Sequence, residues 1–221
     1  MAKRAVVFGT GSFADLADLY LRTDAGFDVV AFVVTADREG EKTYRGRPVF
    51  TLDEIAERVP PDSAQAFVAV GYRKLNSLRA EFCAILKGKG YQLLSYVSSK
   101  ASYWPEETPI GENVFIFEDN TIQAFGKIGD GVVLWSGNHI GHHSTIGNYC
   151  FLTSHVVVSG HCTIGDNCFL GVNSTIADSL TIGPRNLIGP GALIQKSTGP
   201  DEAYFAARAE KFGKPSSWFM K

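Results

Sequence analysis

The feature that most constrains the fold of this chain is an aliphatic residue at every sixth position from Ile110 to Ile194. Fifteen successive positions of this series carry Ile, Leu or Val, and no insertion breaks the phase. An α-helix would repeat every 3.6 residues and a half-buried strand every two, so neither accounts for the pattern. A fixed six-residue repeat is typical of a parallel β-helix.

A second period of eighteen residues lies on top of the first, because Ile110, Ile128, Ile146, Ile164 and Ile182 are each followed by glycine. Three six-residue units per turn give a triangular coil, and we call the stacked coils the prism. We therefore predict an all-β, left-handed parallel β-helix of about five coils within residues 99–198. The residues four places after each aliphatic are mostly small or aliphatic and are expected to fill the interior: Val114, Gly126, Val132, Ser144, Cys150, Val156, Cys162, Cys168, Ser174 and Ala192.

The chain before the prism has the pattern of an α/β domain. Strands are expected at residues 5–8, 29–34, 66–70 and 91–97, and helices at about 12–21, 54–58 and 76–87. Strands that alternate with helices predict a small parallel sheet covered on both faces, which gives a Rossmann-like domain over residues 1–98. Residues 199–221 are expected to form a tail, with a helix from Glu202 to Phe212.

Composition narrows the class of protein. The chain of 221 residues has a net charge of -2 and no run of like charge, so it offers no surface for nucleic acid or an acidic membrane. Apolar runs such as residues 29–34 are too short to span a bilayer, and the first residues do not resemble a signal peptide. Three of the four cysteines fall in interior slots of the prism, so we expect reduced packing thiols in a cytoplasmic protein.

A glycine-rich loop follows the first expected strand. Gly9, Gly11 and Ala14 fit the dinucleotide-binding pattern G-x-G-x-x-G/A. NAD nevertheless fits poorly, because Asp37 comes late for the expected acidic residue and only half of a doubly wound sheet is present. A mononucleotide or nucleotide sugar at the helix amino terminus fits better, since backbone N–H groups there suit an anion. A tight turn that simply needs glycine is the alternative.

The histidines of this chain are clustered. None of the five falls on an interior position of the repeat, so all are expected to point outward: His139, His142, His143, His155 and His161. His143 and His161 are eighteen residues apart and should stack on neighbouring coils, and Gly160 comes eighteen residues after His142. Such a cluster indicates a function rather than five solvated side chains.

Two chemistries compete for the cluster. A zinc site needs three converging imidazoles with carboxylates that orient them. The coils supply no adjacent carboxylate, and His155 and His161 are expected on different faces, so we expect no metal. A single histidine acting as general base fits better, because a free imidazole titrates close to neutral pH. Gly160 is then expected to offer a bare backbone N–H to a developing oxyanion one coil away.

The whole pattern is similar to a known family. The prism, the small α/β domain before it and the run Ile-Gly-His-His-Ser-Thr-Ile-Gly at 140–147 together resemble the NeuD-type sugar acyltransferases, which include bacillosamine and perosamine N-acetyltransferases and sialic acid O-acetyltransferases. The segment Val-Ala-Val-Gly-Tyr-Arg-Lys-Leu at 68–75 also resembles the middle of these proteins. The resemblance implies a homotrimer that uses acetyl-CoA, with active sites at subunit boundaries.

The resemblance also implies roles for individual residues. His142 falls on the general base and Gly160 on the glycine whose amide meets the thioester oxygen. The expected contacts to CoA are Gly160, Phe151, Val172 and Pro190, and the loop that holds the nucleotide sugar is Gly11, Ser12 and Phe13. The chain departs from its relatives at His143, which replaces the Asp or Glu that usually follows the base. Either histidine could therefore act as the base, and we favour His142.

These observations predict acetyl transfer from acetyl-CoA to a hydroxyl or amine of a sugar, which we expect to be nucleotide-linked, in surface-polysaccharide biosynthesis. A non-catalytic trimeric binding or scaffold protein on the same fold is the main alternative, and a zinc-dependent β-helix enzyme is a weaker one. The residues leave open which sugar is used, whether oxygen or nitrogen is acylated, whether the acyl group is acetyl, and what the tail does.

Overall fold

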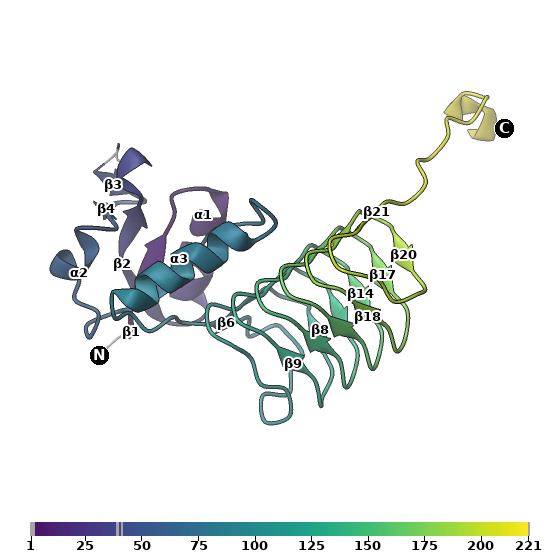
Figure 1. Ribbon diagram of the computed structural model, residues 1–221. Coiled ribbons are helices and arrows are strands. Elements are labelled where there is room, and N and C mark those ends of the chain that lie inside the picture. Colours follow the sequence, from purple (N-terminus) through teal and green to yellow (C-terminus); the bar gives the residue numbers. More distant parts are fainter. Residues whose placement is uncertain (1–2, 39, 41, 221) are drawn as a thin grey trace.

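The amino-terminal part of the chain is a five-stranded sheet with helices on both faces (Figure 1). The structure is a computed structural model that describes residues 3–38, 40 and 42–220. The strand order is β3-β4-β2-β1-β5, and every pair is parallel except β3 with β4. The elements are β1 (Lys3–Phe8), α1 (Ser12–Thr23), β2 (Phe27–Val34), the 3₁₀ turn η1 (Ala36–Arg38), β3 (Thr43–Tyr44), β4 (Arg47–Thr51), α2 (Ile55–Arg58), β5 (Gln65–Val68) and α3 (Ser77–Gly88).

Alternation of side chains along β1 separates two cores in this domain. Ala5 and Val7 pack against the buried stripe of α1, whereas Val6 and Phe8 pack with residues of α2 and α3 on the other face. The predicted sheet covered on both faces is therefore confirmed, but it is a mixed sheet, because β3 is antiparallel to β4. The side of the sheet that carries α1 also faces the prism, because Phe115 of the prism belongs to the same buried cluster as Val7.

The rest of the chain forms the prism, whose three flat sides are parallel sheets (Figure 1). The first prism sheet contains β6 (Tyr96–Val97), β7 (Phe115–Ile116), β10 (Val133–Leu134), β13 (Phe151–Leu152), β16 (Phe169–Leu170), β19 (Leu187–Ile188) and β21 (Ala203–Tyr204). The second contains β8 (Thr121–Ile122), β11 (His139–Ile140), β14 (Val157–Val158), β17 (Thr175–Ile176) and β20 (Leu193–Ile194). The third contains β9 (Lys127–Ile128), β12 (Thr145–Ile146), β15 (Thr163–Ile164) and β18 (Thr181–Ile182).

The six-residue repeat forms the core of the prism as predicted. Each strand from β7 to β20 pairs with a strand eighteen residues away, so that Ile146 lies between Ile128 and Ile164. The aliphatic residues of the repeat after Ile110 are at most 5% exposed, and they form one continuous cluster with the small interior residues. The left-handed β-helix of about five coils is confirmed.

Three interior slots hold asparagine, which the repeat did not predict. Asn120, Asn138 and Asn186 are all buried. Their amides bond to backbone groups, as when the Val156 N–H donates to Asn138 Oδ1 one coil below at 2.8 Å. These amides connect successive coils at the corners of the prism, where the strand ladders are interrupted.

A buried guanidinium joins the two parts of the molecule. Arg79 of α3 is fully buried and lies against the prism, where no carboxylate of the described chain bonds to it. Burial lowers the pKa of Arg79 to about 10, so the side chain stays charged at neutral pH. Its nitrogens donate to the Asn76 side chain and to the carbonyl oxygens of Val70, Gly71, Gly131, Tyr149 and Cys150.

Three local expectations differ from the structure. Residues 96–97 were expected in the amino-terminal sheet, but β6 pairs with β7, so the prism begins at Tyr96, two residues before the domain boundary expected at 98. The expected helix from Glu202 to Phe212 is wrong, because β21 pairs with β19 and the next residues extend away from the prism (Figure 1). Strands β3 and β4 were not predicted.

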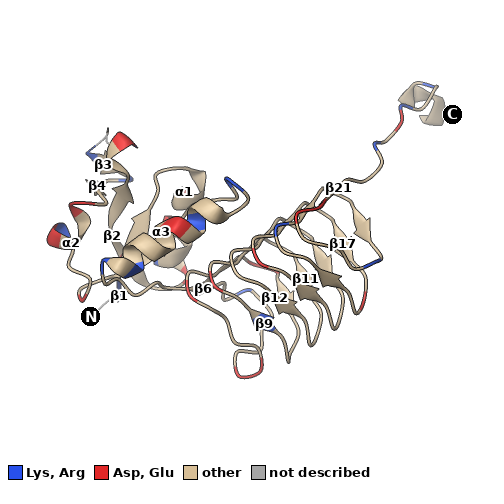
Figure 2. Cartoon of the chain, in the orientation of Figure 1, with Lys and Arg blue, Asp and Glu red and all other residues tan. Residues whose placement is uncertain are grey.

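The charged residues and cysteines follow the expected pattern. Figure 2 shows basic and acidic residues interspersed along the described chain. All four cysteines are buried and free. No helix of the described residues is long and apolar enough to cross a membrane.

Candidate active site

The corner of the prism between the second and third sheets carries His142. This residue lies in the turn from β11 to β12, and its backbone N–H donates to Gln123 Oε1 at 2.9 Å. The ring is exposed and points along the prism axis toward the next coil. A Cβ built on Gly160 would lie 2.9 Å from Cε1 and 3.1 Å from Nε2 of His142. The predicted juxtaposition of His142 with the bare backbone of Gly160 is therefore present.

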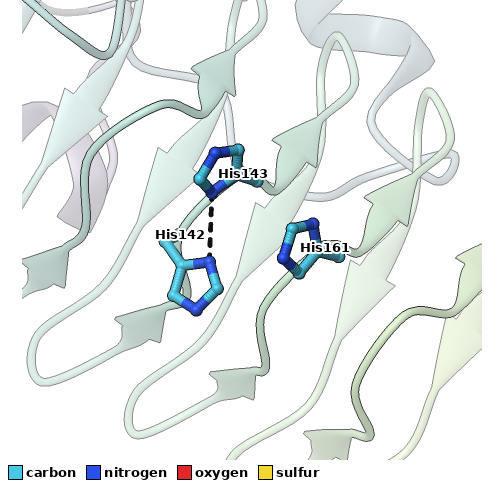
Figure 3. A group of neighbouring side chains, drawn as sticks. All are labelled: His142, His143 and His161. Atoms are coloured by element: carbon cyan, nitrogen blue, oxygen red, sulfur yellow. Dashed lines mark hydrogen bonds between the residues drawn. The ribbon is translucent and has the colours of Figure 1, made fainter.

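The next residue, His143, contacts the other edge of the His142 ring. The two Nδ1 atoms are 3.1 Å apart (Figure 3). One of the two nitrogens must then carry the hydrogen and the other must accept it. If His142 donates from Nδ1, its lone pair is left on Nε2, at the edge that faces Gly160. In that arrangement Nδ1 of His143 accepts the hydrogen bond from His142.

A third imidazole completes the cluster. His161 stacks on His143, with ring centroids 4.9 Å apart and an angle of 19° between the planes, as their spacing predicted. His161 also meets the His142 ring edge-on at 5.0 Å. The ligand atoms of the three histidines all lie within 4.8 Å of one another (Figure 3). The sequence argument against zinc assumed that three imidazoles would not converge, and that assumption is wrong.

The same argument assumed that no carboxylate is nearby, and Asp178 contradicts it. Asp178 lies one coil beyond Gly160, and its Oδ1 is 3.2 Å from the position that a Gly160 Cβ would occupy. The remaining histidines do not join the cluster. His139 is half-buried on β11, and His155 lies at a different corner, beside Gly137.

Gly160 has the space that its predicted role requires. Among the described residues its backbone N–H donates no hydrogen bond, although its carbonyl accepts one from the Ser179 N–H at 3.0 Å. The three atoms nearest to a side chain here would belong to the His142 and Asp178 side chains, and none of the three is a backbone atom. The site is thus a free amide beside an imidazole edge, open to solvent on the outside of the prism.

A second candidate site lies at the carboxyl ends of β1, β2 and β5. A cavity of about 740 Å³ is lined there by the predicted loop of Gly11, Ser12 and Phe13. Ligands of open α/β sheets bind at this edge, and the amino terminus of α1 points its N–H groups into it. Phe13 also packs edge-on against Phe67 and Phe115, so it is partly a packing residue.

The backbone of this loop needs glycine at one of its two glycine positions and not at the other. Gly9 has a φ of 116°, and a Cβ there would lie 3.1 Å from the carbonyl oxygen of Ala69, so the turn itself needs glycine. Gly11 has open space around its Cα and no positive φ. The tight-turn explanation therefore accounts for Gly9 and leaves Gly11 free for close approach of a ligand.

The comparisons with known proteins agree with this fold. A family model for bacterial transferase hexapeptide repeats (six repeats) matches residues 125–160 and 161–196. The chain is similar to a mutant of perosamine N-acetyltransferase from Caulobacter crescentus, in complex with CoA and GDP-perosamine, at 25% identity and a TM-score of 0.81, covering 90% of this chain and 91% of that chain. PerB from the same organism, with the same two ligands, has 27% identity and a TM-score of 0.78, covering 89% and 90%. The repeat model and these structural matches support the NeuD-type sugar acyltransferase family for this chain.

A further structural match supports the fold alone, and the search of curated proteins found no relative. The acetyltransferase domain of PglB from Neisseria gonorrhoeae, in complex with acetyl coenzyme A, has 20% identity and a TM-score of 0.79, covering 92% of this chain and 97% of that chain. Because the structural matches are sugar N-acetyltransferases, we describe the chain as an acyltransferase and do not retain the alternative of a non-catalytic scaffold.

In this acyltransferase the residues expected to contact CoA do not lie together. Val172 and Pro190 are exposed at the corner between the first and second prism sheets, one coil apart. Gly160 lies at the corner between the second and third sheets. Phe151 is only 3% exposed, because Tyr72 of the amino-terminal domain covers it with ring centroids 5.3 Å apart. Phe151 is thus a packing residue between the two domains of this acyltransferase, and its predicted contact with CoA does not fit the structure.

Sequence reasoning missed several residues of the acyltransferase that line the 740 Å³ cavity. Its wall includes Asp37 and Arg38, which both belong to η1, and Tyr72 and Arg73, which follow β5. Asp37 had been judged too late in the sequence for a role. The turn η1 brings it back toward the end of β2, where it lines the cavity with Thr35.

Proposed function

We propose that this protein transfers an acetyl group from acetyl-CoA to a hydroxyl or amine of a nucleotide-linked sugar, with His142 as general base. The observation that carries the proposal is the His142 ring edge held beside the bare backbone of Gly160. An imidazole lone pair and an unused amide N–H, side by side on an open surface, are the two groups that acyl transfer needs.

The chemistry follows from these two groups. Nε2 of His142 takes the proton from the acceptor as its oxygen or nitrogen attacks the thioester carbonyl. The Gly160 N–H donates to the oxyanion of the tetrahedral intermediate. Collapse of that intermediate breaks the carbon–sulfur bond and releases CoA, whose thiolate recovers the proton. The Nδ1 contact with His143 at 3.1 Å supports the imidazolium that forms in between. No covalent enzyme intermediate is needed.

The proposed donor and acceptor come from the relatives. Perosamine N-acetyltransferase and PerB are described with CoA and GDP-perosamine, and the PglB domain with acetyl coenzyme A. In this chain the cavity beside α1 is the proposed nucleotide-sugar site, with Gly11, Ser12 and Phe13 on one wall. Arg38 and Arg73 line the same cavity and can neutralise a diphosphate. Gly160, Val172 and Pro190 are the proposed contacts to CoA.

A homotrimer is proposed because one chain does not bring its two sites together. Tyr72 of the sugar cavity packs on Phe151 and Phe169, which project from the first prism sheet. His142 lies at the corner opposite that sheet, between the other two. In the proposed trimer an acceptor bound in the cavity of one copy therefore reaches His142 of a neighbouring copy. The corner that carries Val172 in one copy likewise lies beside the corner that carries Gly160 in another.

The biological setting is also a proposal. The resemblance supports a role in surface-polysaccharide biosynthesis, with residues 1–98 binding the nucleotide sugar, residues 99–198 transferring the acyl group and residues 199–221 as a tail. A cytoplasmic location is supported by four buried cysteines that form no disulfide.

The test is His142→Ala, assayed by thiol release from acetyl-CoA across a panel of nucleotide-linked sugars and amino sugars. We expect turnover to fall by roughly 10²- to 10⁴-fold while the oligomeric state by light scattering is unchanged. His155→Ala is the matched control, because it removes an exposed histidine from another corner. Near-normal turnover in His142→Ala would exclude His142 as the base, and an equal loss in His155→Ala would mean that the loss is not specific to the His142 corner.

A further inference from the structure

The three clustered imidazoles allow a chemistry beyond proton transfer. His142, His143 and His161 come from two successive coils and are all exposed, and their ligand atoms lie within 4.8 Å of one another. We propose that they form a binding site for a divalent transition-metal ion, best fitted by Zn²⁺, and that the bound ion inhibits acyl transfer. The metal is thus an inhibitor and not a cofactor, and the inhibition rests on the proposed role of His142.

The backbone holds the three rings in register. His143 and His161 occupy equivalent corner positions on neighbouring coils, with φ of 57° and 55°, and their rings are stacked. His142 is the residue before His143, and its carbonyl accepts the His161 N–H at 2.9 Å. Phe125, one coil below, packs on His143 at 5.1 Å. Three imidazoles therefore project from a rigid corner, which reduces the entropy lost when they bind one ion.

The distances suit a first-row transition metal. Zinc binds imidazole nitrogen at about 2.0–2.1 Å, so two tetrahedral ligands lie about 3.4 Å apart. The Nδ1 atoms of His142 and His143 are already 3.1 Å apart, and the third nitrogen reaches the ion by rotation of an exposed side chain. Neutral imidazole selects zinc, copper or nickel over Mg²⁺ and Ca²⁺, which prefer oxygen. The open side of the cluster leaves the fourth position to water.

The nearby carboxylate favours a cation. The position that a Cβ on Gly160 would occupy is 3.2 Å from Asp178 Oδ1 and 2.9 Å from His142 Cε1, so the carboxylate is close to the histidine cluster. Its negative charge offsets part of the positive charge of a divalent ion. Asp178 bonds to the Ser179 hydroxyl at 2.7 Å, which keeps it on this corner.

Metal binding and base catalysis exclude each other at His142. An ion on Nδ1 replaces the hydrogen shared with His143, and the one remaining ring proton of neutral His142 then lies on Nε2. An ion on Nε2 takes the lone pair directly. In both cases the edge that faces Gly160 loses its proton acceptor, so the metal-bound enzyme cannot deprotonate the acceptor.

The experiment measures binding and inhibition separately. Purified full-length protein, freed of metal with a chelator, is titrated with ZnCl₂ by calorimetry and with CoCl₂ by visible absorption. We expect one ion per chain with a dissociation constant in the micromolar range, or roughly -8 kcal/mol. Affinity should fall at least tenfold in His161→Asn and in His143→Asn. His155→Asn, the matched control at another corner, should bind as the unaltered protein does.

The outcomes distinguish this proposal from the proposed function. Absence of binding, or binding that His161→Asn leaves unchanged, overturns the metal site whatever the enzyme's substrate. If Zn²⁺ binds as expected but thiol release continues at the same rate with the site filled, the inhibition is refuted and His142 is not the base. The metal site and the role of His142 are both supported if a chelator reverses the inhibition and if His161→Asn weakens inhibition and Zn²⁺ affinity to the same extent.

Discussion

The substitution Gly160→Ala tests the active-site geometry most directly. The added methyl would lie 2.9 Å from Cε1 and 3.1 Å from Nε2 of His142, whereas ordinary carbon contacts are about 3.5–4.0 Å. The ring must therefore retreat by roughly 0.5–1 Å. Gly160 does not have a positive φ, so alanine is compatible with its backbone.

The size of the effect follows from this displacement. A misplacement of about 1 Å can cost on the order of 10²-fold in rate, so we expect kcat/KM to fall roughly 10- to 100-fold, or about 1.4–2.7 kcal/mol of transition-state stabilisation. Stability should change by less than about 0.5 kcal/mol, because the methyl meets only the exposed side chains of His142 and Asp178. The expected result is a catalytic defect in a fully stable protein.

The assay compares thiol-release kinetics with thermal unfolding for a set of variants. Gly213→Ala is the neutral control, since a Cβ there meets nothing within 4 Å. Gly141→Ala is the opposite control, because its Cβ would lie 2.6 Å from the backbone nitrogen of Gly160 and should destabilise the fold. Gly160→Ala combined with His142→Ala shows how much of the loss in kcat/KM does not depend on displacement of the His142 ring.

Two results would refute this reasoning. A kcat/KM of Gly160→Ala within about threefold of the unaltered enzyme would mean that the imidazole edge and the bare amide do not act together. A loss of stability as large as that of Gly141→Ala would mean that the backbone, and not the exposed side chains, absorbs the methyl.

Three further predictions concern stability. Arg79→Met should cost at least about 3 kcal/mol in urea denaturation, because it leaves buried carbonyl oxygens without a donor. Ile146→Ala should cost about 2–5 kcal/mol in the same assay, since a cavity opens in the aliphatic ladder. Hydrogen bonds from Ser99 and Tyr96 lower the pKa of Asp24, so its stabilising contribution is present above the unfolded-state pKa of 3.8 and is lost as pH falls through the lower folded value. Asp24→Asn should therefore reduce the melting temperature at pH 7, and the difference should shrink in acid; a difference independent of pH would contradict this.

The prism could be predicted from the sequence because its contacts repeat locally. Each aliphatic residue of the series pairs with residues one coil away, so a single period determines both the fold and the burial of residues such as Ile146. The same period predicted that Gly160 lies beside His142 and that His161 stacks on His143. Contacts between residues eighteen positions apart were therefore predictable.

Contacts between residues that do not stack on one another along the prism, and contacts between the two domains, could not be predicted from the sequence. The period gives no ring orientation, so it did not show that His142 turns toward the stacked pair and that Asp178 approaches the same corner. Phe151 has the sequence of an outward position, and only the docking of Tyr72 buries it. The turn after β2 that brings Asp37 to the cavity likewise depends on tertiary structure.

Arg79 has a consequence for engineering of the acceptor specificity. Its guanidinium donates to carbonyl oxygens from each of the two halves of the protein, so neither half retains a complete set of partners when it is separated from the other. A chimera that grafts the nucleotide-sugar domain of one relative onto the β-helix of another should thus fold only if the recipient β-helix presents matching carbonyl groups at the junction. Grafts that exchange the loops around the sugar cavity, and leave α3 in place, avoid this requirement.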